Sequence, residues 1–240
     1  MDIHTLYDKS VKACKKCGGT GVLLQQDTFI DCTCMTDFKN KMSVIRSRIP
    51  SKYHKFDLRN LTQDFRANNE VALQIIRKYT EFIQDNVEQG YGLFFQAQPG
   101  LGKTSLACYI LIRALHAGLK AGFIRYSDLI TLTFKSLEDS DAMSQLDYLR
   151  ECDIICIDRI DHGYVQESAY ARERIDDLFS HWHSSERSLL ITSNTPRKDM
   201  VSFPFSYIFN DLIDIVFVGE SFRGDVNALQ IIMSRNKEKG

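Results

Sequence analysis

The residues with the clearest chemical purpose form a glycine-rich turn near the middle of the chain. Residues 97–104 read AQPGLGKT, which is the form of a phosphate loop with alanine in place of the usual first glycine. Backbone N–H groups of such a loop converge on phosphate oxygens, and the N-terminus of the following helix adds its positive end. Lys103 would reach the β- and γ-phosphates, and the Thr104 hydroxyl would bind Mg²⁺. The sequence therefore predicts an ATP site formed by Pro99, Gly100, Leu101, Gly102, Lys103, Thr104 and Ser105.

A carboxylate that could share this Mg²⁺ ion stands at the end of a later apolar run. Residues 154–157 are apolar, and Asp158 follows them directly. In open α/β folds, nucleotides and their metal ions bind at the carboxyl ends of the strands. We therefore expect Asp158 to hold Mg²⁺ together with Thr104, from a strand that neighbours the strand before the phosphate loop.

Two further residues could act on the γ-phosphate. Asn194 follows the apolar run 189–191 and could orient an attacking water, but it could equally cap the turn that follows. Arg223 stands at the start of the last expected helix, where it could contact phosphate or simply be exposed to solvent. Together with Lys103 and Asp158, these two residues make up the candidate catalytic set.

A second group with metal-binding chemistry lies near the N-terminus. Four of the seven cysteines fall within 21 residues, as the pairs Cys14/Cys17 and Cys32/Cys34. A strand–turn–strand pattern over residues 22–30 would bring the second pair back beside the first, giving a tetrahedral set with closed coordination. We therefore predict a structural Zn²⁺ site, because so small a unit has little core of its own. The alternative is four cysteines without metal in a flexible arm. The other three cysteines stand in apolar stretches and are expected in the core.

These groups need a scaffold, and the rest of the chain supplies alternating strand and helix patterns. A helical period over residues 68–88 is followed by a nearly continuous apolar run, the phosphate loop and a helix over Lys103–His116. This alternation predicts a parallel sheet covered by helices on both faces. The expected strands are 92–96, 121–126, 153–158, 188–192 and 215–218.

Composition excludes several classes of protein and divides the chain in two. Of the 240 residues, 44% are hydrophobic and 25% are charged, values ordinary for a globular protein. The chain shows neither a membrane-length apolar run nor a signal pattern, so we expect a cytoplasmic protein without a membrane partner. Residues 1–60 hold 11 Lys and Arg against 6 Asp and Glu, a net charge of +5, whereas residues 61–240 carry −6. The basic segment is typical of an interaction region, and the acidic remainder disfavours strong DNA binding.

The order and spacing of these motifs resemble the DnaC/IstB-like group of AAA+ ATPases, which includes bacterial and phage loaders of the replicative helicase. This resemblance implies an α/β fold with a doubly wound, parallel five-stranded P-loop sheet and a small N-terminal zinc-binding domain. It also implies that Thr104 and Asp158 serve Mg²⁺, and that Asn194 and Arg223 are the two sensor residues. The segments that carry it are residues 14–34, 49–56, 92–107, 127–129, 153–158, 190–194 and 219–223.

By the same resemblance, residues 1–60 would grip the hexameric replicative helicase, and residues 61–240 would bind ATP and, weakly, single-stranded DNA. Self-assembly on the helicase ring is a further expectation. Residues 131–135 and the last helix are candidate DNA contacts, although hydroxyls and one lysine also suit any solvated helix.

Two positions depart from the family pattern. Arg159 stands where a second acidic residue usually follows the strand-end aspartate, and Asp161 is the nearest carboxylate. The expected arginine finger aligns with residues 210–212, which read Asn-Asp-Leu. Since that arginine stabilises γ-phosphate charge, we expect weak ATP hydrolysis at most.

Three functions remain open from the sequence. The first is an ATP-dependent loader of the replicative helicase, favoured by the intact Lys103, Thr104 and Asp158. The second is a non-hydrolysing nucleotide-switch adaptor, favoured by Arg159 and Asp211. The third is a transposition helper ATPase, which the cysteine arm disfavours.

Overall fold

A five-stranded parallel sheet forms the centre of the body in the computed structural model, which describes residues 3–161, 169–200 and 206–219. Every pairing between neighbouring strands of this sheet is parallel, which confirms the predicted fold class. In the order in which they lie across the sheet, the strands are β4 (Ala121–Arg125), β5 (Ile154–Asp158), β6 (Ser188–Ser193), β3 (Gly92–Gln96) and β7 (Leu212–Val216).

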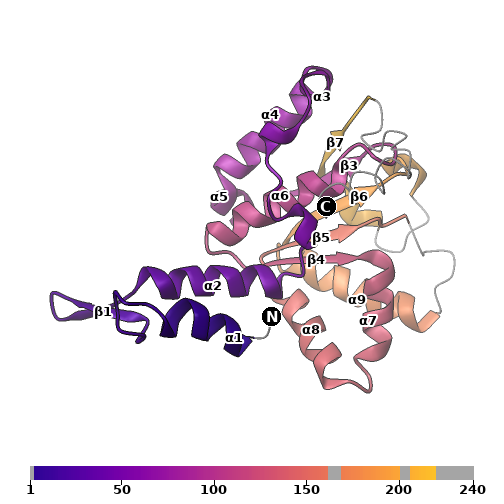
Figure 1. Cartoon of the computed structure of the whole chain (residues 1–240). Coiled ribbons are helices and arrows are strands. Elements are labelled where there is room, and N and C mark those ends of the chain that lie inside the picture. The colour runs from indigo at the N-terminus through magenta and orange to yellow at the C-terminus, as the bar shows by residue number, and fades with distance from the viewer. Residues whose placement is uncertain (1–2, 162–168, 201–205, 220–240) are drawn as a thin grey trace, which may run out of the picture.

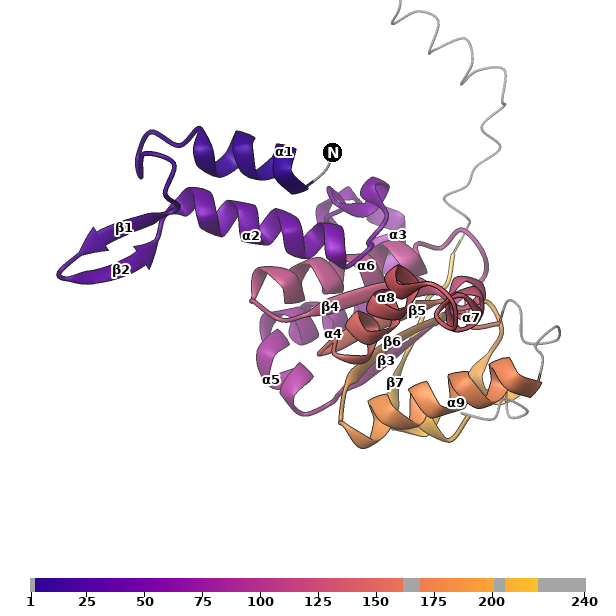
Figure 2. The same cartoon turned by 90° about the horizontal axis from the view of Figure 1, so that it is seen from below.

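Helices cover both faces of the sheet, as Figure 2 shows. Alternate residues of β3 supply the two cores: Leu93 and Phe95 face one hydrophobic cluster, and Phe94 faces the other. The helices that contribute to the first cluster are α3 (Gln63–Asn68), α4 (Glu70–Glu81), α5 (Ile83–Glu88) and α6 (Lys103–His116). The helices that contribute to the second cluster are α7 (Tyr126–Lys135), α8 (Ser140–Arg150) and α9 (Ala169–Ser184).

The position of β5 differs from the sequence prediction. Asp158 was expected on a strand next to the phosphate-loop strand, but β6 lies between β5 and β3. The prediction was wrong because adjacency along a parallel sheet is set by crossover packing, which sequence order does not reveal. Thr104 nevertheless meets Asp158, since α6 contacts β5 and β6 as well as β3.

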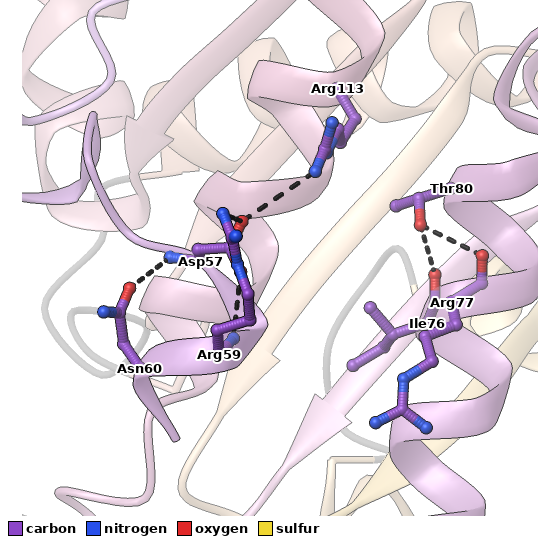
Figure 3. A network of polar contacts seen from close by, with 7 residues as sticks. All are labelled: Asp57, Arg59, Asn60, Ile76, Arg77, Thr80 and Arg113. Atoms are coloured by element: carbon purple, nitrogen blue, oxygen red, sulfur yellow. Dashed lines mark hydrogen bonds and ion pairs between the residues drawn. The ribbon is translucent and has the colours of Figure 1, made fainter.

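The helix predicted over residues 68–88 is interrupted. Phe82 has φ −112° and ψ 42°, which separates α4 from α5. Two residues before this break, the Thr80 hydroxyl donates back to the carbonyl oxygens of Ile76 and Arg77, each at 3.0 Å (Figure 3). Such back-bonding competes with the helical ladder and bends helices, so the long apolar period conceals a break.

The last strand begins three residues earlier than predicted. β7 is an edge strand, and Ile213 and Asp214 are exposed along it. An edge strand tolerates a charged residue because one side of it faces solvent. The prediction over 215–218 followed the apolar residues alone and therefore missed the first half of the strand.

A separate arm projects from the body and ends in a two-stranded hairpin (Figures 1 and 2). In the turn of this hairpin, Gln26 and Asp27 have φ of 47° and 61°, the pattern of a type I′ turn. The hairpin predicted over residues 22–30 is confirmed. The arm consists of α1 (Ile3–Tyr7), η1 (Asp8–Lys12), β1 (Val22–Gln25), β2 (Thr28–Asp31) and α2 (Thr33–Arg46).

The segment that follows the arm is bound to the body rather than hanging free. Phe123 of β4 donates its N–H to the Ser47 carbonyl at 2.8 Å, and Ile49 is buried in the first cluster. Two short 3₁₀ turns follow, η2 (Ser51–Tyr53) and η3 (Leu58–Asn60). Asp57 caps η3, and its carboxylate lies 3.9 Å from the Arg113 guanidinium of α6 (Figure 3). In the described part of the chain, no helix is long and apolar enough to cross a membrane.

Candidate functional site

The phosphate loop joins β3 to α6, as the sequence predicted. Gly100 and Gly102 adopt φ of 91° and 76°, a backbone region in which side chains with a Cβ are strained. Gly102 is the last residue before α6, so the first N–H groups of the helix are left without partners inside the helix. Ala97 is buried at the exit of β3, where its small side chain fits the position usually held by glycine.

The loop borders a cavity of about 430 Å³ at the carboxyl ends of β5 and β6. Three of the side chains that line it are cations, and none of the described lining residues is acidic. This charge balance suits a polyphosphate. The predicted Leu101 is absent from the lining because its side chain is buried in the first cluster, which leaves only its backbone to contact a ligand. The lining residues are Lys52, Tyr53, Pro99, Gly100, Gly102, Lys103, Thr104, Ser105, Arg159, Thr192, Ser193 and Asn194.

Lys103 is held inside the loop. It is 8% exposed, and its ammonium donates to the carbonyl oxygens of Ala97 at 2.6 Å and Gln98 at 3.0 Å. It also donates to Oδ1 of Asn194 at 2.9 Å. These acceptors are neutral, whereas phosphate oxygens are charged and bind an ammonium group more strongly. A nucleotide could therefore draw Lys103 away from them.

Asp158 lies beneath the cavity with hydroxyl groups around it. It is 3% exposed, and its Oδ1 accepts hydrogen bonds from Oγ1 of Thr104 and Oγ1 of Thr192, each at 2.7 Å. A carboxylate beside a hydroxyl is a set of hard oxygen ligands that suits Mg²⁺. The residues predicted to hold magnesium are thus in direct contact, and the donor set fits the ion.

Asn194, in the bend directly after β6, lines the cavity and contacts Lys103. Its amide nitrogen donates to Oδ2 of Asp161 at 3.2 Å, while Oδ1 of that aspartate is buried and has no hydrogen-bond partner among the described residues. The turn is instead closed by Ser193, whose hydroxyl donates to the Thr195 carbonyl and accepts the Thr195 N–H. Of the two interpretations of Asn194, its contacts therefore favour a role at the nucleotide.

The remaining predicted positions have different outcomes. Arg159 lines the cavity with an exposed side chain. Asp211, at the expected arginine-finger position, accepts a hydrogen bond at Oδ2 from Nε2 of His183 at 2.9 Å. Arg223 and the last helix lie outside the described residues.

The four N-terminal cysteines meet at the base of the hairpin. Their Sγ atoms all lie within 4.8 Å of one another, with Cys14 and Cys32 3.9 Å apart and Cys17 and Cys34 3.5 Å apart. Four sulfurs about 2.3 Å from a tetrahedral Zn²⁺ have edges of about 3.8 Å. Gly21, at φ 78°, donates its N–H to Sγ of Cys17 at 3.2 Å. The cluster therefore fits the predicted zinc site.

The protonation of these thiols also favours a metal. Burial raises the pKa of Cys17, but the Gly21 N–H and the neighbouring thiols outweigh burial and lower this pKa to about 6. Burial and the neighbouring thiols, Cys14 first among them, raise the pKa of Cys34 well above its usual value. A negative charge on one thiolate disfavours a negative charge on its neighbour. A divalent cation that took the place of the protons would offset this repulsion.

The other cysteines have no such role. Cys108, Cys152 and Cys156 are each fully buried, and burial raises the pKa of all three thiols. This confirms the prediction that they belong to the core.

Two features of the site were not assigned from the sequence. Thr192 holds Asp158, and the only signal for it is a hydroxyl at the end of an otherwise apolar strand. Lys52 and Tyr53 reach the cavity from η2. They lie in the family-like segment 49–56, but nothing in their types indicated a place beside the phosphate loop.

Comparisons with solved structures find the same fold in replication proteins. The crystal structure of the DnaC helicase loader has a TM-score of 0.54 and 22% identity, covering 65% of this chain and all of that one. DnaI has a TM-score of 0.59 and 15% identity, covering 71% of this chain and 95% of that one. AMPPCP-bound DnaA from Aquifex aeolicus has a TM-score of 0.56 and 16% identity, covering 80% of this chain and 56% of that one.

At these identities the likeness establishes the fold, which is that of the AAA+ P-loop ATPases. No curated protein is similar enough to count as a match. A family model described as IstB-like ATP binding protein matches residues 47–203, from the end of the arm to beyond β6. Because that range covers more than half of the chain, the protein belongs to the family of IstB-like ATP-binding proteins.

Proposed function

We propose that this protein is an ATP-dependent loader that places a replicative DNA helicase on single-stranded DNA in the cytoplasm. The observation that carries the proposal is the combination, in one chain, of a cationic phosphate-loop cavity and a separate Cys₄ arm. The cavity supplies a nucleotide-dependent body, and the arm supplies a surface for a partner. The fold shared with the DnaC helicase loader supports this assignment.

The two parts divide the work. In the proposal the arm binds the helicase and the body binds ATP, as expected for residues 1–60 and 61–240. Residues 47–60 pack on the body through Ile49 and the cap formed by Asp57. We therefore propose residue 47 as the point where the partner-binding unit ends, and residues 47–60 as a firmly attached connection.

The arm presents an apolar surface suited to a protein partner. Leu24 and Phe29 face each other across the hairpin and are 65% and 73% exposed. Exposed apolar side chains of this size gathered on one element are typical of interaction sites. The proposed partner is the hexameric helicase, with several copies of this chain assembling on its ring.

A weak contact with single-stranded DNA is proposed at a cavity lined by both ends of the predicted segment 131–135. Three cations, Arg48, Arg125 and Lys135, line a second cavity of about 580 Å³ together with Thr131. Three aspartates line the same cavity and offset these cations, so phosphate attraction there is small. These aspartates are Asp128, Asp139 and Asp141.

The chemistry at the nucleotide site follows from four side chains. Lys103 would neutralise the β- and γ-phosphates, and Thr104 and Asp158 would hold Mg²⁺, which stabilises charge on the transferred phosphoryl group. Asn194 would orient water, with Asp161 hydrogen-bonded behind it. Arg159 in place of the second acid favours slow turnover and keeps a second candidate open, the non-hydrolysing switch adaptor.

The test compares the full-length wild type with Lys103→Ala. Binding of ATP, hydrolysis of ATP, binding to the host's purified replicative helicase, and helicase loading on single-stranded DNA would each be measured. We expect Lys103→Ala to lose ATP binding and loading while it still binds the helicase through the arm.

The outcomes separate the candidates. Loading by the wild type without measurable hydrolysis would favour the switch adaptor. The loader proposal fails if zinc-loaded wild type does not bind the helicase with or without ATP.

A further inference from the structure

We propose that Arg159 is a ligand of the terminal phosphate of ATP, supplied by the same chain that supplies the phosphate loop. It would make the site selective for a nucleoside triphosphate over a diphosphate. The inference rests on the proposed function, because it requires nucleotide in the phosphate-loop cavity.

The backbone at Arg159 is held in an unusual conformation. Its φ is 56°, a left-handed region that is strained for a residue with a Cβ. The Arg159 N–H donates to Oγ1 of Thr192 at 2.9 Å, and the next N–H, from Ile160, donates to the Thr192 carbonyl at 3.0 Å. The same Thr192 hydroxyl donates to Asp158. Arg159 is therefore fixed by the network that fixes the metal-binding carboxylate.

The position of Arg159 points to the terminal phosphate. The loop residues Gly100–Ser105 approach the cavity from β3, whereas Arg159 approaches it from the end of β5, with β6 between them. Thr104 and Asp158 would hold a Mg²⁺ ion that offsets phosphate charge, and Asp158 directly precedes Arg159. A phosphate chain that starts at the loop and reaches this metal site would therefore present its terminal group to Arg159.

The charge of Arg159 is available for this role. Its side chain is exposed and lines the cavity, and none of the ion pairs among the described residues includes Arg159. Guanidinium is well suited to phosphate because it presents several donors in one plane. The proposed function expects no arginine finger from a neighbouring copy, since Asp211 occupies that position and contacts His183. Arg159 would provide a positive charge for binding the terminal phosphate within one chain.

The test measures the affinity of the full chain for AMPPCP and for ADP, both with Mg²⁺, by isothermal titration calorimetry. Arg159→Asn removes the charge while keeping a residue that tolerates positive φ, and Arg159→Lys keeps a positive charge. Arg48→Asn is the matched control for nucleotide affinity measured without DNA, because Arg48 is also exposed with φ 55° but lines the second cavity and not the nucleotide cavity.

We expect Arg159→Asn to weaken AMPPCP binding by about 10- to 100-fold, with ADP affinity changed by less than about twofold. Arg159→Lys should lose less AMPPCP affinity than Arg159→Asn, and Arg48→Asn should bind both nucleotides as the wild type does. Equal losses for both nucleotides, or no loss for either, would overturn the role of Arg159 and leave the proposed function standing. A wild-type chain that binds neither nucleotide would overturn both.

Discussion

Replacing Thr192 with valine tests whether one hydroxyl group holds the metal-binding end of the site together. The hydroxyl donates to Oδ1 of Asp158 at 2.7 Å and accepts the N–H of Arg159 at 2.9 Å. Valine has nearly the same shape, so Thr192→Val removes these two hydrogen bonds without opening a cavity.

The size of the effect follows from burial. Thr192 is 1% exposed, so water cannot readily replace the lost hydroxyl. A hydrogen bond to a charged group contributes about 1.5–3 kcal/mol, and a buried N–H left without a partner costs about 1–3 kcal/mol. Because Asp158 keeps its second donor, Thr104, we expect a loss of about 3 kcal/mol in the free energy of unfolding.

Urea unfolding followed by tryptophan fluorescence measures this loss. Trp182 is the single tryptophan and is fully buried on α9, so its emission reports on the body and not on the arm. With an m-value of about 2 kcal/mol/M, the midpoint should fall by about 1–2 M. Thr131→Val, at an exposed helical position, is the control and should change stability by less than about 0.5 kcal/mol. A midpoint for Thr192→Val equal to that of the control would refute the reasoning.

Three further predictions concern the arm, the sheet and the connection between them. Chelation of zinc, or Cys32→Ser, should remove one Zn²⁺ per chain, as measured by metal analysis, and should lower the helicity seen by far-UV circular dichroism. Trp182 fluorescence should stay unchanged, and unaltered helicity would contradict a structural site. Gly92→Ala should cost about 1–3 kcal/mol in urea unfolding, because a Cβ there would lie 2.6 Å from the Leu189 carbonyl oxygen; an unchanged midpoint would show that the strands can separate. Hydrogen bonds from the Arg59 side chain and N–H hold the pKa of Asp57 below its usual range. The wild type should therefore be more stable than Asp57→Asn above about pH 5, and this advantage should vanish as the pH falls through the lowered pKa. A pH-independent difference in urea midpoint would count against this cap.

Much of the fold could be read from local patterns. β3 and α6 begin and end at the predicted residues, because a buried apolar run and a glycine-rich turn leave little choice of boundary. The predictions failed where a side-chain hydroxyl bonds back to the helix backbone, and where one side of a strand faces solvent. Thr80 bonds back to the helix backbone just before the break at Phe82, which the apolar period of residues 68–88 conceals. Asp214 belongs to a strand that lies at the edge of the sheet.

The candidate site was predictable in its parts but not in its assembly. The types and spacing of the phosphate-loop residues identify the anion site, since few sequences place glycines, a lysine and a hydroxyl in that order. The place of Lys52 beside the loop, and the contact of Asp161 with Asn194, depend on segments far apart in the chain. No local pattern encodes such contacts.

The sequence by itself determined which chemistry this protein carries: a phosphate loop, a strand-end carboxylate and four clustered cysteines, because these depend on residue types at short spacing. Tertiary structure alone decided how they combine. It placed β6 between the two halves of the nucleotide site and brought Thr192 against Asp158. It also turned Arg159 into the cavity with a left-handed backbone. The physical reason is that strand order and crossover packing are set by burial of the whole sheet, which short-range sequence patterns do not specify.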